Sequence, residues 1–216
     1  MKRIFGFVEM VFDVLYLTAA AVIGFVLLFG GQDSLTRTLA GIMTLVLVGG
    51  DAFHLVPRIY AILTGKEEQM RRVLGRGKQM TSITMTIFYI LLWHIGLLVY
   101  TPKYILIWSC IVYALALMRI LLCLLPQNEW SARFTPVKWS VWRNVPFFLQ
   151  GMIVSGLFLL YGNASTGLGL VWIAIILSFV FYLPVVLWVN KSPKIGMLML
   201  PKTCAYLWLL AMCLPL

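Results

Sequence analysis

The sequence has 216 residues, of which 62% are hydrophobic and 11% charged, and its mean hydropathy is +0.97. These values lie far outside those of soluble domains and predict an integral membrane protein. No polar stretch is long enough to form a soluble domain, so we expect a single membrane domain over residues 1–216.

Seven apolar stretches reach the length of about 20 residues that a membrane-spanning helix needs. The first is too long for a cleaved signal peptide and carries Glu9 and Asp13, so we expect it to be retained as a span. The chain is therefore predicted to be an all-α protein with seven transmembrane helices, at residues 4–30, 36–63, 79–100, 104–125, 145–161, 167–189 and 195–216.

The basic residues indicate how these helices cross the membrane. Twelve of the 17 Lys and Arg residues precede the first span or lie in the connections that share its side, whereas the other side has only Arg37 and Lys103. The positive-inside rule then predicts a cytoplasmic N-terminus and an outside C-terminus, in the plasma membrane. The net charge of +10 is explained by the basic residues in the connections on the cytoplasmic side, so it does not indicate nucleic-acid binding. The expected partner is the lipid bilayer.

The most informative stretch is residues 49–58, inside the second predicted span. Asp51, His54 and Arg58 have i, i+3, i+7 spacing, which places them on one face of a helix. Ionisable groups within a span cost about 2.5 to 3.5 kcal/mol each on insertion scales, so they normally face protein or a water-filled cavity. This stretch therefore predicts a site.

Other spans carry matching polar groups. The embedded bases Arg58, Arg119 and Lys202 are balanced by three embedded acids, which is also compatible with purely structural ion pairs between helices. At 1.5 Å rise per residue, most embedded polar side chains fall in the cytoplasmic half of the membrane. We therefore predict a cytoplasm-facing polar pocket with twelve ligand-binding candidates: Asp51, His54, Arg58, Glu9, Asp13, Thr86, Tyr89, Arg119, Gln150, Tyr182, Lys202 and Tyr206.

An internal repeat is suggested by short matches. Spans three and seven share Thr-x-x-Tyr. The span before each of them contains a proline, Pro57 in span two and Pro184 in span six. These matches favour a parallel 3+1+3 duplication, with the fourth span as connector and the site between the triplets.

A carrier or sensor of a small amphipathic molecule or lipid fits this pattern best, with Asp51 and His54 as a proton-coupling pair. The alternative is an intramembrane hydrolase or acyltransferase, in which Asp51 orients His54 as base and Ser82, Thr86 or Cys204 is the nucleophile. No Gly-x-Ser-x-Gly or His-Glu-x-x-His motif supports that alternative.

Two further alternatives remain. Lys202 in the seventh span is compatible with a retinal-type photoreceptor, although the third span has no carboxylate as a counterion. A structural or partner-binding subunit would use the embedded charges for helix specificity alone.

Metal or cofactor binding is not expected, because the four cysteines form no CxxC pair and the two histidines fall on opposite sides of the membrane midplane. The sequence carries no signal for a particular oligomeric state.

Overall fold

The computed structural model describes residues 2–31, 34–162 and 167–216. All regular secondary structure in this part of the chain is helical, and seven helices are long and apolar enough to span a membrane. The predicted all-helical class and the seven apolar helices are thus confirmed. The elements are α1 (Lys2–Phe29), α2 (Leu35–Thr64), α3 (Arg71–Tyr100), α4 (Ile105–Leu124), η1 (Pro126–Asn128), α5 (Val137–Tyr161), α6 (Val171–Trp188), η3 (Pro193–Leu198) and α7 (Met199–Met212).

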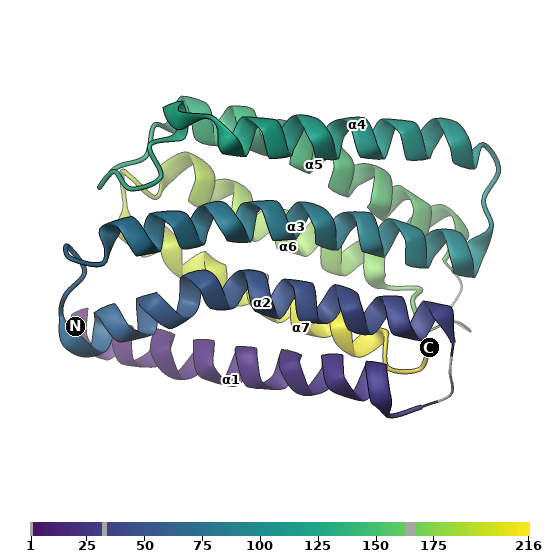
Figure 1. The fold of residues 1–216 in the computed structure, drawn as a ribbon, viewed down its shortest axis with the longest axis horizontal. Helices are drawn as coiled ribbons and strands as arrows, with labels where there is room; N and C mark the ends of the chain where they lie inside the picture. Colours follow the sequence, from purple (N-terminus) through teal and green to yellow (C-terminus); the bar gives the residue numbers. More distant parts are fainter. Residues whose placement is uncertain (1, 32–33, 163–166) are drawn as a thin grey trace.

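The helices lie nearly side by side in two layers (Figure 1). One layer contains α1, α2, α3 and α4 in chain order, and behind it lie α7, α6 and α5; α1 contacts α7, and α3 contacts both α4 and α5. The N-terminus and the α2–α3, α4–α5 and α6–α7 connections share one end of the bundle, which we call the basic end, and the C-terminus lies at the other.

Several helix boundaries differ from those predicted. α3 begins at Arg71 instead of residue 79, and α5 begins at Val137 instead of residue 145. The predicted span 167–189 begins later, at Val171, and 195–216 is divided into η3 and a shorter α7 that ends at Met212. Hydropathy finds only the apolar part of a helix, whereas Arg, Lys and Gln extend helices as readily as Leu does.

Local chemistry explains the ends of α2. The Ser34 side chain accepts a hydrogen bond from the Arg37 backbone N–H at 3.1 Å, which satisfies one of the free donors in the first turn. At the other end Gly65 adopts a left-handed conformation with φ +68°, which glycine does at little cost. α2 also contains Pro57 in its interior, as α6 contains Pro184.

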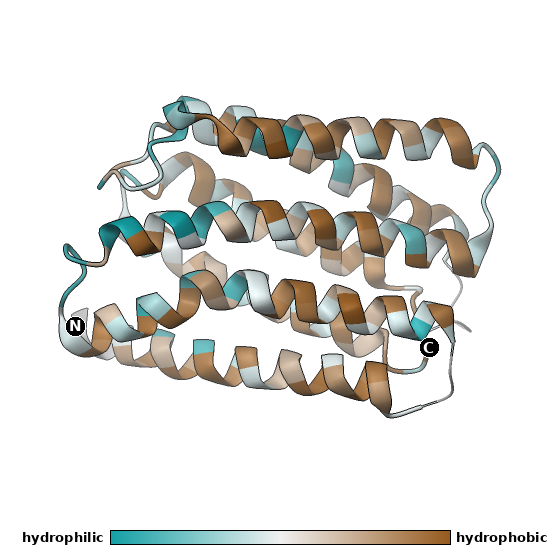
Figure 2. Cartoon of the chain, in the orientation of Figure 1, coloured by the Kyte–Doolittle hydropathy of each residue, from teal (hydrophilic) through white to brown (hydrophobic). Residues whose placement is uncertain are grey.

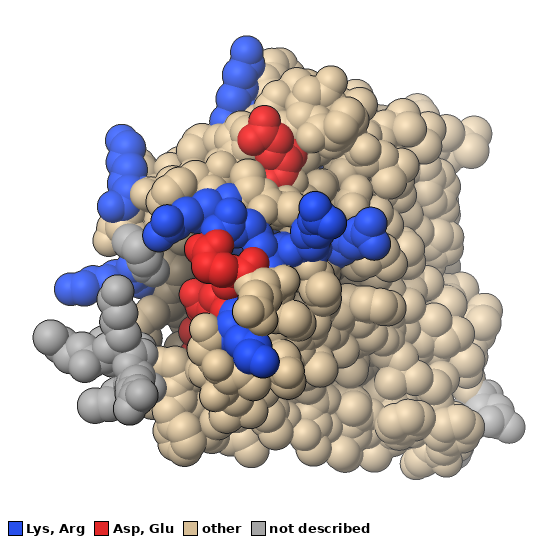
Figure 3. Space-filling model, turned by 60° about the vertical axis from the view of Figure 1, so that its left-hand side comes forward, with Lys and Arg blue, Asp and Glu red and all other residues tan. Residues whose placement is uncertain are grey.

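The outer surface of the bundle is apolar. Phe29, Leu106 and Leu160 are 80%, 76% and 78% exposed, which suits contact with lipid and not with water. Hydrophilic residues concentrate toward the basic end (Figure 2), and the surface there carries both basic and acidic side chains (Figure 3). The charged groups are thus gathered at one end of an otherwise apolar bundle.

Between the layers lies an aromatic core. Tyr89 packs edge-to-face on Phe147 with ring centroids 5.1 Å apart, and Phe147 packs on Phe179 at 5.2 Å. Phe88 makes a similar contact with Tyr206 at 5.6 Å. These contacts join α3, α5, α6 and α7, and edge-to-face pairs stabilise beyond simple area burial.

Glycines let α2 and α3 approach closely near the basic end. A Cβ atom on Gly77 would overlap the backbone oxygen of Phe53 and lie 2.8 Å from the Cα atom of His54. A Cβ atom on Gly50 would overlap the Thr84 side chain, so Thr84 serves helix packing. The approach of these two helices positions the residues described next.

Candidate functional site

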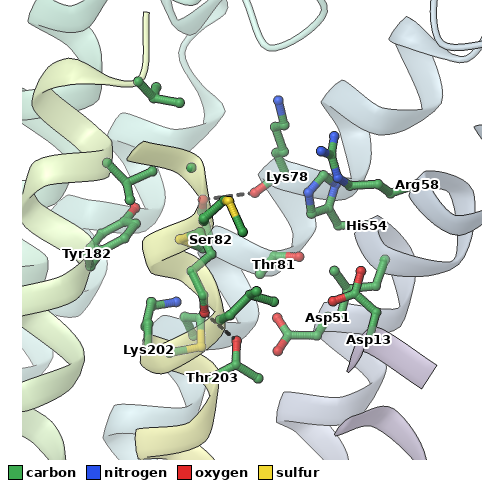
Figure 4. Close-up of a pocket in the computed structure, with 18 of the residues that line it drawn as sticks. Asp13, Asp51, His54, Arg58, Lys78, Thr81, Ser82, Tyr182, Lys202 and Thr203 are labelled. Carbon is green, nitrogen blue, oxygen red and sulfur yellow. Dashed lines mark hydrogen bonds between the residues drawn. The ribbon is translucent and has the colours of Figure 1, made fainter. Parts of the chain in front are cut away.

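A cavity of about 400 Å³ lies between the helices toward the basic end. Its lining includes residues from all seven transmembrane helices, and Figure 4 shows many of them as sticks. Eight of the twelve predicted ligand-binding residues line it: Glu9, Asp13, Asp51, His54, Arg58, Arg119, Tyr182 and Lys202.

The other four candidates, Thr86, Tyr89, Gln150 and Tyr206, are buried deeper and lie outside the described lining. The Tyr89 and Tyr206 hydroxyls are 3.2 Å apart, and the Ser178 hydroxyl donates to Tyr206 at 3.4 Å. The Gln150 amide donates to the backbone oxygen of Thr86 at 3.5 Å. These residues form a polar layer within the core next to the cavity.

The acidic wall of the cavity comes from α1 and α2. Arg58 forms an ion pair with Glu9, which lies one turn before Asp13. The Tyr16 hydroxyl donates to Asp51 Oδ2 at 2.6 Å. Within the described part of the chain, Asp13 Oδ2 is buried without a hydrogen-bond partner. Asp13 of α1 and Asp51 of α2 lie near one another in this part of the cavity (Figure 4).

His54 lies on the same wall, but no hydrogen bond joins it to Asp51 among the described residues, and its buried Nδ1 atom has no partner there either. Among the described residues, no hydrogen bond joins a proposed nucleophile to His54 either. The Ser82 hydroxyl donates to the Lys78 backbone oxygen at 2.9 Å, and Cys204 lies outside the described lining.

Besides Arg58, the lining carries four basic side chains, which we call the basic quartet: Lys78, Arg119, Arg143 and Lys202. Arg119 is only 2% exposed, and its guanidinium carbon lies 3.2 Å from the centroid of the Phe147 ring. In the described chain its Nε and Nη1 atoms have no hydrogen-bond partner. A buried guanidinium in this state is costly unless something else satisfies it.

Two other members of the quartet are held by aromatic rings. The Lys202 Nζ atom lies 5.0 Å from the Tyr182 ring centroid and 5.1 Å from that of Tyr206. The Arg143 guanidinium lies 4.2 Å from the Trp130 ring centroid. Such contacts orient a cation without neutralising its charge.

No protein-family model, curated protein or solved structure matches this chain. The site is therefore interpreted from its own chemistry.

Lys78 and Arg143 were missed as site residues, because both fell in predicted connections, where their charge was assigned to topology. Their spacing does contain a signal. Lys78 precedes Ser82 by one helical turn, and Arg143 precedes the predicted candidate Gln150 by two turns. Extending each polar stripe one turn beyond the apolar segment would have found both.

A second cavity of about 530 Å³ lies at the other end, between α3, α4 and α5, and is lined mostly by apolar side chains such as Trp108 and Met152. His94 is also toward this end, where its Nε2 atom lies 2.9 Å from the Tyr113 hydroxyl and its Nδ1 atom 2.8 Å from the Ile90 backbone oxygen. The two histidines thus have separate surroundings.

Proposed function

We propose that the protein binds a small amphipathic molecule or lipid in the cavity at the basic end and acts as its carrier or sensor. The observation that carries this proposal is the lining of that cavity. Charged side chains from six helices share it with apolar ones, including Leu55, Met85, Val185 and Leu200. A molecule with a polar head and an apolar part matches both kinds of wall.

The size and the unsatisfied groups support a bound molecule. A volume of about 400 Å³ lies within the usual range for small-molecule sites, roughly 300 to 1,000 Å³. Asp13, His54 and Arg119 each have a buried polar atom without a partner in the described chain. Buried polar groups are normally hydrogen-bonded, so a ligand that bonds to these three would remove the cost of leaving them unpaired.

A hydrolase would need a base in contact with a nucleophile, and the described residues of this cavity contain no such contact. The carrier or sensor is therefore the function that this geometry supports best. Its proposed setting is the plasma membrane, with the N-terminus and the cavity mouth toward the cytoplasm. The clustering of basic residues at the same end supports this orientation. The two helix triplets related by a 3+1+3 repeat remain part of the proposal.

The orientation has a direct test by cysteine labelling. Arg76 and Lys103 are exposed at opposite ends of the bundle. In a variant without native cysteines, a membrane-impermeant maleimide added to intact cells is expected to label Lys103→Cys and to leave Arg76→Cys unlabelled until the membrane is permeabilised. The reverse pattern would overturn the N-in, C-out orientation.

The bound molecule is expected to survive purification in mild detergent. Native mass spectrometry of the wild-type protein should show an added mass, and extraction should identify it as an amphipathic metabolite or lipid. The double variant Asp51→Asn, His54→Ala is expected to lose most of this mass, because it removes the charge of one cavity residue and the ring of another.

His94→Ala is the matched control, since it removes a histidine at the other end of the bundle. It is expected to retain the bound mass. If wild type and the double variant carry nothing, and the double variant is markedly less stable, the embedded charges are structural and the proposed function is wrong.

A further inference from the structure

The charges of the cavity are unevenly paired. Within residues 2–31, 34–162 and 167–216 there are two ion pairs, Glu9–Arg58 and the exposed Glu68–Arg71. Only the first lies at the cavity. After it is set aside, the described lining contains two acids, Asp13 and Asp51, against the four cations of the basic quartet. The cavity therefore has a surplus of two positive charges when these groups are ionised.

The quartet also brings like charges together. Lys202 is attracted by Asp51 and, less strongly, repelled by Arg119. Lys78 is repelled by Arg58 and, less strongly, by Arg143. Repulsion between neighbouring cations costs free energy that increases as the surrounding dielectric falls. A cluster of this kind is stable when an anion lies between its members.

The members of the quartet differ in burial in an ordered way. Lys78 is exposed, Arg143 and Lys202 are half-buried, and Arg119 is almost completely buried. Cations that line a cavity attract an anion into it, and the attraction is least screened at the most buried of them. Arg119 can then donate hydrogen bonds to the anion from its unpaired N–H groups. Hydrogen bonds between a guanidinium and an oxyanion are strong because both partners are charged.

We propose that the basic quartet binds the phosphate group of a phosphate ester, with Arg119 as its deepest contact. This inference rests on the proposed function and specifies the polar head of its ligand. A phosphate monoester carries a charge of about −1.5 to −2 at pH 7, which matches the surplus of the cavity. A carboxylate would neutralise only half of that surplus.

The apolar part of the ligand has a place on the same cavity. Val185 of α6, Val189 just after the end of α6, and Leu200 of α7 are part of the lining. A phospholipid head with its chains toward α6 and α7 fits both surfaces, and a soluble phosphate ester fits the quartet alone. Both share the same phosphate chemistry, so the test must separate them.

Binding to the purified protein is measured with four probes. These are dioctanoyl phosphatidic acid, glycerol 3-phosphate, inorganic phosphate and dioctanoylglycerol, which has the same chains without phosphate. We expect dioctanoyl phosphatidic acid to bind and Arg119→Gln to weaken it by about thirtyfold or more, because a buried charged contact is lost. Lys78→Gln should weaken it by less than about fivefold, because that contact is exposed and screened.

Arg133→Gln is the matched control. Arg133 is exposed at the same end of the bundle but lies outside the described lining, so affinity should be unchanged. If Arg119→Gln fails to fold, Lys202→Met takes its place, since Lys202 is half-buried and its removal must also weaken binding. High salt should weaken binding to the wild type.

The outcomes separate the sources of phosphate and the two proposals. If glycerol 3-phosphate binds as well as the lipid and with the same dependence on the quartet, the ligand is a soluble phosphate ester and the anion site stands. If dioctanoylglycerol binds as tightly as phosphatidic acid, or if no phosphate probe binds, the inference is wrong. In that case an unrelated amphiphile retained in native mass spectrometry would still support the proposed function.

Discussion

Gly77→Ala is expected to lower the free energy of unfolding by about 1 to 3 kcal/mol, the usual cost of overpacking a tight contact. The added methyl group would overlap the backbone oxygen of Phe53 and approach the Cα atom of His54 to 2.8 Å. Backbone atoms cannot turn aside as the end of a flexible side chain can. α2 and α3 must therefore separate where His54 and Lys78 enter the cavity.

The midpoint of thermal unfolding in detergent measures this effect, and Gly49→Ala is its matched control. Gly49 lies in α2, and apart from its chain neighbours and the backbone of its own helix no described atom lies within 4 Å of its added methyl group. Because alanine is the better helix former, this variant should be stabilised by about 0.5 to 1 kcal/mol. The two glycine substitutions should thus change stability in opposite directions.

The Gly77 variant also tests whether the helix contact shapes the site. Molecules that still fold should retain less of the co-purified ligand, because the acidic wall moves relative to α3. If Gly77→Ala is as stable as Gly49→Ala and keeps its ligand, then the close approach of α2 and α3 is not needed for either.

The residues that sequence analysis found share one property. Asp51, His54 and Arg58 stand out because an apolar helix has no ordinary use for them, and helical periodicity then gives their common face. The eight predicted candidates on the cavity all belong to this group of embedded polar residues. Composition and period were sufficient to locate them.

Two physical reasons explain why the predicted candidates and the lining of the cavity differ. Lys78 and Arg143 lie where a helix leaves its apolar segment, so hydropathy could not distinguish a cavity residue from a loop residue. Tyr89 and Tyr206 lie on the predicted faces, but their hydroxyls meet each other in the core at 3.2 Å. Periodicity gives the direction of a side chain, and only packing tells how far the cavity extends along the helix.

Arg119→Met is expected to stabilise the ligand-free protein and to abolish its response to ligand. Arg119 is 2% exposed, and in the described chain two of its nitrogen atoms lack partners. Replacing buried charge by an apolar side chain of similar volume is often neutral or stabilising by up to about 4 kcal/mol. The unfolding midpoint without ligand should therefore rise.

The same variant should respond differently when ligand is added. A molecule that binds only the folded state stabilises it by about 2.7 kcal/mol at a concentration of 100 times its dissociation constant. Dioctanoyl phosphatidic acid should therefore raise the midpoint of the wild type and leave that of Arg119→Met nearly unchanged. Arg119→Met would then have a higher unfolding midpoint than the wild type without ligand, but a smaller rise of the midpoint when ligand is added.

Arg58→Met is the control that distinguishes a structural charge from a functional one. Its removal leaves Glu9 without its ion-pair partner, so stability should fall, by at most about 1 kcal/mol because both side chains are about one-third exposed. Adding Glu9→Gln should restore it. If Arg119→Met instead destabilises the ligand-free protein as Arg58→Met does, Arg119 is held by the fold itself, and the structural or partner-binding subunit becomes the better account of the embedded charges.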